Sequence, residues 1–469
     1  MEGLEAVENN LSYISSINRF DAEFFNKKFI NQDTKLKLLP HIKISEFADV
    51  TDGEHGSPEL DENSGIVYLS GHNIKDNLID LDNIRYCSLN LHNKNLRSSL
   101  KIGNVLISIV GTVGKSSVVY TNIVANTDRN IATIKNINNK INPYYLSTFI
   151  NSNFGIFQTK RFSAGNVQPL LNLIQVKSIV VPLLSQQFQQ KIENLVTTAH
   201  SYLEQSQTLY KQAEQILLTE LDLENFKSSK NNIAIKSIKN SFLDSGRLDA
   251  EYYQEKYEQL EEHIKNYKGG FAKIEDFIDD YSTGYPFDSD TYSENGDIDL
   301  IRITNIKNGY LDLSNTNKVP LLKDNAIYRN IVKENDLLIS MSGTIGNCCK
   351  IEKNIHAIIN QRILKLSIKD YEQDTLCLII NSIICKMQLE KIGTGGVQTN
   401  ISPKDIFNIV IPILPLETQT QISSKIQQSF LLKTKSQKLL NIAKLAVEIA
   451  IEQSEEKALQ YITEQEKLL

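Results

Sequence analysis

The stretch Arg19-Phe-Asp-Ala-Glu-Phe-Phe25 returns later in the chain as Arg247-Leu-Asp-Ala-Glu-Tyr-Tyr253, an offset close to half of the chain. Further matches keep their order at nearly the same offset. They pair Lys43-Ile-Ser-Glu-Phe47 with Lys273-Ile-Glu-Asp-Phe277, Asn73-Ile-Lys75 with Asn305-Ile-Lys307, Gly111-Thr-Val-Gly114 with Gly343-Thr-Ile-Gly346, Gly165-Asn-Val-Gln168 with Gly395-Gly-Val-Gln398, and Val181-Pro182 with Ile411-Pro412. A period this long is far above that of a solenoid unit, so each copy is a domain with its connector.

Within each copy the residue pattern changes once. The first part mixes short β-rich runs with turn signals, as in Val105–Val110 before Gly111 and in 336–340 before Gly343. A short helical stretch follows, at 144–150 in the first copy and at 376–381 in the second. After the prolines at 182 and 412, glycine and proline disappear and the period becomes helical. The pattern predicts an α+β fold with two tandem α/β domains, each followed by a long helix.

The two long helices carry a seam of apolar residues. In the first, the steps between apolar positions alternate four and three, which is the heptad pattern of a coiled coil. The seam residues are Phe188, Ile192, Leu195, Ala199, Tyr202, Leu209, Ala213 and Ile216, with Ser206 in one slot. The less regular second seam is Ile422, Ile426, Leu432, Leu439, Ala443, Ala446 and Ala450. We expect the two helices to pair as an antiparallel coiled coil with pseudo-twofold symmetry. The alternative is that each helix packs on its own domain.

The composition is that of a soluble globular protein, with 41% hydrophobic and 23% charged residues in 469. No apolar run reaches the ~18 residues of a membrane span, and the N-terminus lacks the pattern of a secretory signal. Five cysteines without CxxC spacing favour reduced thiols in a cytoplasmic protein. The net charge of −6 mildly disfavours binding of nucleic acid by this chain without a partner. Local basic patches, however, matter more than the total net charge.

Catalytic motifs are missing from the sequence. Gly111-Thr-Val-Gly-Lys-Ser116 has the wrong spacing for a phosphate-binding loop, and its counterpart Gly343-Thr-Ile-Gly-Asn-Cys348 lacks the lysine. We interpret both as turns that need positive φ, with contact to a DNA backbone as the alternative. Asn142-Pro-Tyr-Tyr145 has one proline where an adenine methyltransferase motif has two, and it is interpreted as a helix start. No metal site is expected, and the chain is predicted to be non-catalytic.

Polar and basic side chains in each copy are candidates for contacting DNA. The loop Asp52–Pro58 and its counterpart 282–288 agree in placing a turn but differ in most side chains, as two domains with different targets would. Arginine is suited to guanine, and asparagine or glutamine to adenine. The candidates are Asp52, His55, Ser57, Arg85, Lys94, Arg97, Lys115, Arg129, Arg161 and Gln168 in the first copy, and Tyr285, Arg302, Lys307, Lys323, Arg329, Arg362 and Gln398 in the second.

The ordered, duplicated set of motifs resembles the HsdS specificity subunits of type I restriction-modification enzymes. It comprises R-x-D-A-E-aromatic-aromatic, S-x-x-G-T-[VI]-G, G-x-V-Q and an apolar-Pro exit into a glutamine-rich helix, and it covers nearly the whole chain. The Asp52 loop also resembles the family's D-G-x-H-x-[ST]-P form, whereas the second copy has Gly284-Tyr-Pro-Phe287 instead.

The resemblance implies target-recognition domains at 1–182 and 229–412, with spacer helices at 183–228 and 413–469. Each domain would recognise one half of a bipartite sequence in double-stranded DNA. Two modification subunits and the restriction subunits would be partners in the cytoplasm, with no membrane involved. Those partners, and not this chain, would hold S-adenosylmethionine, ATP and Mg²⁺. The alternatives are a specificity module of another bipartite methyltransferase or defence system, a non-DNA coiled-coil scaffold, and a self-contained enzyme.

Overall fold

The computed structural model describes residues 7–8, 10–12, 14, 19–82, 84–163, 169–227, 233–239, 241–293, 295–321, 325–393 and 400–469. The chain divides into two compact units. Unit 1 comprises Met1–Glu204 and Leu432–Leu469, and unit 2 comprises Gln205–Leu431. Within the described ranges, no helix combines the length and apolar character needed to cross a membrane.

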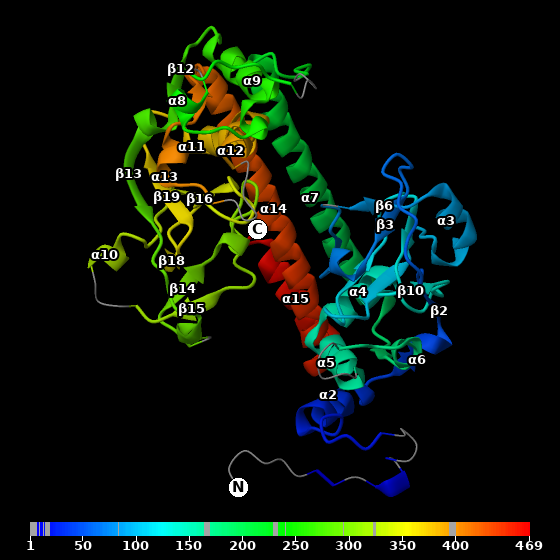
Figure 1. Cartoon of the computed structure of the whole chain (residues 1–469). Coiled ribbons are helices and arrows are strands. Elements are labelled where there is room, and N and C mark those ends of the chain that lie inside the picture. Colours follow the sequence, from blue (N-terminus) through cyan, green and yellow to red (C-terminus); the bar gives the residue numbers. More distant parts are fainter. Residues whose placement is uncertain are drawn as a thin grey trace. The chain divides into compact units, whose positions relative to one another are not determined.

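The first repeat, in unit 1, is built on a four-stranded antiparallel sheet in the order β2-β10-β7-β8. Figure 1 labels β2 and β10 of this sheet. A second sheet, β6-β3-β9, contains one parallel pair, between β3 and β9. Short antiparallel pairs join β1 to β11 and β4 to β5. The strands are β1 (His41–Lys43), β2 (Asp49–Asp52), β3 (Val67–Leu69), β4 (Ile74–Lys75), β5 (Leu78–Ile79), β6 (Arg85–Tyr86), β7 (Val105–Ser108), β8 (Ser116–Val118), β9 (Ala125–Thr127), β10 (Ile131–Lys135) and β11 (Val180–Pro182).

Helices pack against one face of the main sheet of unit 1. Helix α4 contacts β7, β8 and α5, and α5 also contacts α2. The helix start predicted at Asn142 is confirmed, because the Asn142 side chain accepts hydrogen bonds from the first backbone N–H groups and Pro143 occupies the first turn. The helices are α2 (Lys27–Lys37), α3 (Leu89–Lys94), α4 (Pro143–Asn151), α5 (Asn153–Phe162) and α6 (Leu173–Lys177), with 3₁₀ turns η1 (Ile44–Glu46), η2 (Gly71–Asn73) and η3 (Leu96–Ser98).

The second repeat, in unit 2, has counterparts of three of these sheets, and in place of the β4-β5 pair it has the single bridge between Ile306 and Leu311. Its sheets are β13-β19-β16-β17, β15-β14-β18 and β12-β20, and β14 and β18 form the parallel pair. The strands are β12 (Phe271–Lys273), β13 (Ile278–Thr283), β14 (Ile298–Ile301), β15 (Asn317–Val319), β16 (Leu337–Ser340), β17 (Cys348–Lys350), β18 (Ala357–Ile359), β19 (Ile363–Ile368) and β20 (Val410–Pro412). The helices are α8 (Phe242–Ser245), α9 (Glu255–Lys265), α10 (Asn325–Tyr328), α11 (Gln373–Asn381), α12 (Ile383–Gly393) and α13 (Pro403–Phe407), with 3₁₀ turns η4 (Ala250–Tyr253), η5 (Ile274–Phe277), η6 (Ser289–Thr291) and η7 (Ile303–Asn305).

The strand register is also duplicated. Val105 faces Val118 across β7 and β8, and at the equivalent position of the second repeat Leu337 faces Lys350 across β16 and β17. The predicted internal repeat and the α+β fold class are therefore confirmed.

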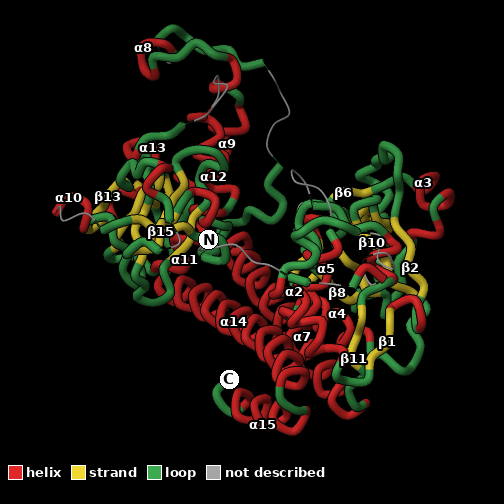
Figure 2. Tube along the Cα trace, turned by 90° about the horizontal axis from the view of Figure 1, so that it is seen from below, coloured by secondary structure: helices red, strands yellow, loops and turns green. Residues whose placement is uncertain are grey.

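Figure 2 shows two long helices, α7 (Gln186–Glu220) and α14 (Leu416–Glu452). Each contributes one part to unit 1 and the other to unit 2. Within unit 2 the Ser206 and Ser429 hydroxyls lie 3.0 Å apart, and Lys425 Nζ donates to Gln212 Oε1 at 2.8 Å. Positions rise along α7 as they fall along α14, so the pairing is antiparallel, as predicted. The helices also join the core of the domains, since Phe188 is buried in the same cluster as β7 and α4. Helix α7 therefore both pairs with α14 and packs on its own domain, so the two predicted arrangements are compatible.

The predicted seams and helix ends need two corrections. In α7, Tyr202, Leu209 and Ile216 are only half-buried, and Leu217 takes a core position instead. In α14, Leu432 is also only half-buried. The segment predicted as a single second helix forms two helices, because α14 ends at Glu452 and α15 (Glu455–Glu466) follows. The hydroxyl of Ser454, in extended backbone, accepts the N–H of Lys457 and caps the new helix.

Candidate nucleic-acid interface

Asp52 stands at the centre of a polar cluster at the end of β2. Its Oδ2 lies 2.7 Å from His55 Nε2, and its Oδ1 accepts a hydrogen bond from Arg97 Nη1 at 3.3 Å. Arg97 also donates to the carbonyl of Gly53 at 3.2 Å. The His55 and Arg97 side chains are more than half exposed. The sequence-predicted residues Asp52, His55 and Arg97 are thus brought together, and the carboxylate orients the two basic side chains toward solvent.

A hollow of about 480 Å³ adjoins this cluster. Arg129 and Asn130, which precede β10, contribute to its wall together with Asp52 and His55. The rest of the lining is Ile109, Val110, Leu170, Leu171, Asn172 and Leu173. Arg129 is exposed, and its backbone N–H donates to the carbonyl of Glu54 at 2.9 Å. The predicted Arg129 therefore lies with the Asp52 cluster, and Asn130 is an addition that sequence reasoning missed.

The corresponding edge of the second repeat carries different side chains. Tyr285 packs edge-on against Phe287, with ring centroids 4.9 Å apart, and its backbone bridges to Asn360. Arg362 is exposed in the left-handed region, with φ of 68°, and its guanidinium lies 3.4 Å from Asn400 Oδ1. A non-glycine residue in this region is uncommon and often marks a functional position.

Arg329 forms an ion pair at the surface of the second repeat. Its Nη2 lies 2.7 Å from Asp280 Oδ1, and both side chains are more than half exposed. Together with Tyr285 and Arg362 it supplies the second group of exposed polar side chains. The sequence alone did not single out Asp280, because a surface aspartate carries no motif.

The remaining predicted residues are spread over both repeats. Arg85 lies over the ring of Tyr68 at 5.4 Å, and Lys115 is bound by both carboxylate oxygens of Asp76, at 2.7 and 2.9 Å. Arg302 donates to the carbonyl of Asn315. Ser57 and Lys94 are exposed and Lys307 is half-buried. In the described part of unit 1, neither Arg85 nor Lys115 forms a hydrogen bond or an ion pair with Asp52, His55 or Arg97. Contact of all six residues with DNA stays a prediction.

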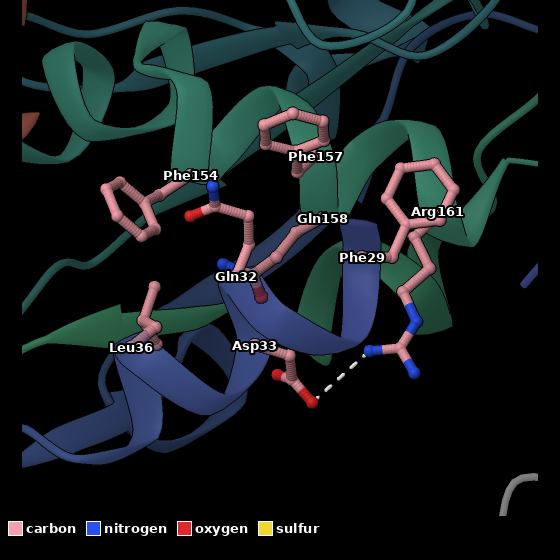
Figure 3. A pocket seen from close by; sticks show the side chains of 8 residues that line it. All are labelled: Phe29, Gln32, Asp33, Leu36, Phe154, Phe157, Gln158 and Arg161. Atoms are coloured by element: carbon pink, nitrogen blue, oxygen red, sulfur yellow. Dashed lines mark ion pairs between the residues drawn. The ribbon is translucent and has the colours of Figure 1, made fainter. Parts of the chain in front are cut away.

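Arg161 corrects the sequence-based prediction. Its side chain is only 6% exposed, and Nη1 lies 3.2 Å from Asp33 Oδ2 (Figure 3). Its Nε donates to the carbonyl of Phe24, and the guanidinium stacks over the ring of the same residue at 4.3 Å. Arg161 of α5 therefore links to Asp33 of α2 inside unit 1. Because its side chain is buried, it is unavailable to DNA.

The R-x-D-A-E motif has a structural role that the sequence did not reveal. Arg19 pairs with Asp21 and donates to the carbonyl of Phe162 at 3.0 Å. Arg247 pairs with Asp249 and donates to the carbonyl of Ile392 at 2.8 Å. In each repeat the motif thus satisfies an orphan carbonyl at the end of a helix, α5 or α12.

The two glycine turns behave as predicted. Gly111, Gly114, Gly343 and Gly346 all have positive φ. The candidates Gln168, Lys323 and Gln398 lie outside the described residues. Over the described part of the chain, no group of three His, Cys, Asp or Glu side chains is placed to hold a metal ion.

The sequence of this chain is similar to those of known proteins. Residues 269–443 match the family model "Type I restriction modification DNA specificity domain". The matched specificity domain begins just before β12 and ends within α14, so it includes the sheets of the second repeat. A curated relative, the type I restriction enzyme EcoBI specificity subunit of Escherichia coli, is 25% identical over 148 residues, and the match spans 31% of each chain. The resemblance predicted from the repeated motifs is confirmed by these matches.

Two solved structures are also similar over most of their length. A type I restriction-modification S subunit from M. genitalium aligns with 88% of this chain and 94% of its own, at 11% identity and a TM-score of 0.41. A solved structure of "complex assembly and conformational transition of the type I R-M system" aligns with 89% of this chain and 99% of its own, at 14% identity and a TM-score of 0.30.

Proposed function

We propose that this chain is the DNA-specificity subunit of a type I restriction-modification complex. The match of residues 269–443 to the type I DNA specificity domain carries this proposal. The first repeat has counterparts of all three sheets of the second, with the same register in the main sheet, which extends the proposal to both repeats. Each repeat would recognise one half of a bipartite DNA sequence.

The side chains support two different half-sites. One backbone framework carries Asp52, His55 and Arg129 in the first repeat, but Tyr285 and Arg362 in the second. Exposed arginines can donate to phosphates and to guanine edges in the major groove. Because the frameworks agree and the side chains differ, the two repeats would dock on DNA alike and select different bases.

The chemistry would belong to other subunits. Two modification subunits would supply S-adenosylmethionine and the adenine-methylating site, and restriction subunits would add ATP- and Mg²⁺-dependent cleavage. The target adenine would be flipped out of the duplex into a modification subunit. This chain would position those subunits on the DNA and would perform no catalytic step.

Methylation-aware long-read sequencing tests the proposal. Genomic DNA would be taken from cells that express this chain with the genes adjacent to it. We expect one bipartite motif with N6-methyladenine on both strands, and its loss when this gene is deleted. If the neighbouring genes are active and no such motif appears, the proposal is overturned in favour of a coiled-coil scaffold that binds proteins.

A further inference from the structure

Arg129 and Gln361 occupy matching positions in the two repeats, at the entrance to β10 and β19. The backbone N–H of Arg129 donates to the carbonyl of Glu54 at 2.9 Å, and that of Gln361 donates to the carbonyl of Tyr285 at 3.0 Å. The preceding residues form the same isolated parallel bridge, Asp128 with Glu54 in one repeat and Asn360 with Tyr285 in the other. The two side chains therefore start from the same point of one duplicated framework.

Both side chains are free to bind a ligand. Arg129 and Gln361 are exposed, and among the described residues neither side chain has a hydrogen-bond or ion-pair partner. Asp52, the carboxylate that shares the hollow with Arg129, is already paired with Arg97 and His55. By contrast, Arg97 and Arg329 are the same residue type at matching positions, so they give the repeats no means of telling two half-sites apart.

The chemistry of the two side chains identifies their ligands. An arginine guanidinium donates two hydrogen bonds to O6 and N7 of guanine, whereas a glutamine amide exchanges two with N6 and N7 of adenine. We propose that Arg129 reads a guanine in one half-site and that Gln361 reads an adenine at the corresponding position of the other. This inference rests on the proposed function and adds the residues that set its specificity.

The neighbourhood of each side chain fits this assignment. Arg129 opens onto the hollow of about 480 Å³, whose polar wall offers Asn130 and His55 beside it. The next residue after Gln361 is Arg362, whose backbone adopts the left-handed conformation and whose side chain is exposed. Substitution at either position leaves the backbone hydrogen bonds intact, so a change in specificity can be measured without loss of the fold.

Two reciprocal substitutions test the proposal in the full chain, expressed with its genomic neighbours. We expect R129Q to replace or relax one guanine of one half-site, and Q361R to do the same to one adenine of the other half-site. Discrimination at that position should fall about 5- to 150-fold, which corresponds to ~1–3 kcal/mol at 1.4 kcal/mol per tenfold. K160Q, which removes an exposed charge at the end of α5, is the matched control and should leave the motif unchanged.

A second measurement uses duplexes in which each guanine of the motif is replaced in turn by 7-deazaguanine, which lacks N7. One replacement should weaken binding by the wild-type complex but not by the complex containing R129Q. If the wild type produces a bipartite motif and neither substitution alters it, or if one substitution alters both half-sites, the inference is overturned and the proposed function stands. If the wild type produces no motif, the proposed function falls, and the inference with it.

Discussion

Arg97 and Arg329 occupy the same position in the two repeats, as their backbone contacts demonstrate. The carbonyl of Arg97 accepts a hydrogen bond from Lys135 Nζ at 2.6 Å, and the carbonyl of Arg329 accepts one from Lys365 Nζ, also at 2.6 Å. Burial lowers the pKa of both lysines. Each arginine is then oriented by a carboxylate on a neighbouring strand, Asp52 for Arg97 and Asp280 for Arg329 in the second repeat. A side chain that both repeats share is suited to contact the DNA phosphates, because phosphates are present in every DNA sequence.

We therefore predict that R97Q and R329Q weaken DNA binding without changing specificity. Each substitution should lower the affinity of the complex for its target and for an unrelated duplex by similar factors. The slope of log K against log salt should become shallower by about 1 for each substitution, because one phosphate contact is lost. Binding titrations at several salt concentrations would measure this. A motif altered in a single half-site would show instead that the arginine reads a base.

Two backbone segments approach each other closely at Gly53, so adding a single methyl group there should lower the stability of the first repeat. A Cβ at Gly53 would lie 1.9 Å from the carbonyl oxygen of Thr127. G53A should therefore destabilise the first repeat by about 2–3 kcal/mol, as overpacking does. G56A is the matched control, because its Cβ would meet only the end of the Glu54 side chain, at 3.0 Å.

Urea unfolding followed by circular dichroism would compare the two alanine variants. Equal stability of G53A and G56A would contradict the packing argument. The second repeat offers an independent check, because a Cβ at Gly284 would also lie 1.9 Å from a backbone oxygen, that of Asn360.

Lys350 and Asp374 form a buried ion pair in unit 2. Lys350 Nζ lies 2.5 Å from Asp374 Oδ1, with side-chain exposures of 7% and 1%. Asp374 Oδ2 also accepts hydrogen bonds from Ser423 and Gln427 of α14. Removing one partner of such a pair leaves an uncompensated buried charge.

We predict that K350M lowers the free energy of unfolding by about 3–5 kcal/mol. The double variant K350M/D374N should recover part of that loss, because the remaining amide is neutral and still meets Ser423 and Gln427. Chemical denaturation of the wild type, K350M, D374N and the double variant would give the coupling energy. A double variant less stable than K350M would argue against a charge effect.

The sequence predicted the duplication, the strands and the two long helices, because each of these depends on local periodicity. It could not separate Arg161 from its exposed neighbour Lys160, since burial of a guanidinium against Asp33 is decided by tertiary packing. It also missed the end of α14 at Glu452, because helical periodicity continues through a break made by one capping serine, Ser454.

The sequence predicted only part of the candidate site. Asp52, His55 and Arg97 converge, as a loop motif with nearby basic residues indicated. Gln361 was missed because a lone glutamine carries no signal until strand register aligns it with Arg129. Repeat alignment guided by β10 and β19 therefore separates the side chains that the repeats share from those in which they differ.

His200 predicts how the stability of unit 1 depends on pH. The imidazole stacks on Tyr120, with ring centroids 3.8 Å apart, and its Nε2 donates to the carbonyl of Asn77 at 2.7 Å. Burial lowers its pKa from 6.5 to about 4, and the hydrogen bond to Asn77 offsets only part of this effect. The folded chain therefore holds His200 neutral at pH values at which the unfolded chain protonates it.

Because the folded pKa is the lower one, the contribution of His200 is complete above pH 6.5 and is lost as pH falls toward about 4. The loss should reach about 3 kcal/mol, given 1.36 kcal/mol per pKa unit. H200F introduces the residue at the matching position of α14, Phe430, because equivalent hydrogen bonds to Gln189 of α7 and Gln419 of α14 align the two helices. It should lower stability at pH 7.5 by the lost hydrogen bond but flatten the decline between pH 6.5 and 4.5. Urea unfolding of both proteins across this range would measure the difference, and parallel pH profiles would show that the buried histidine is not the group responsible.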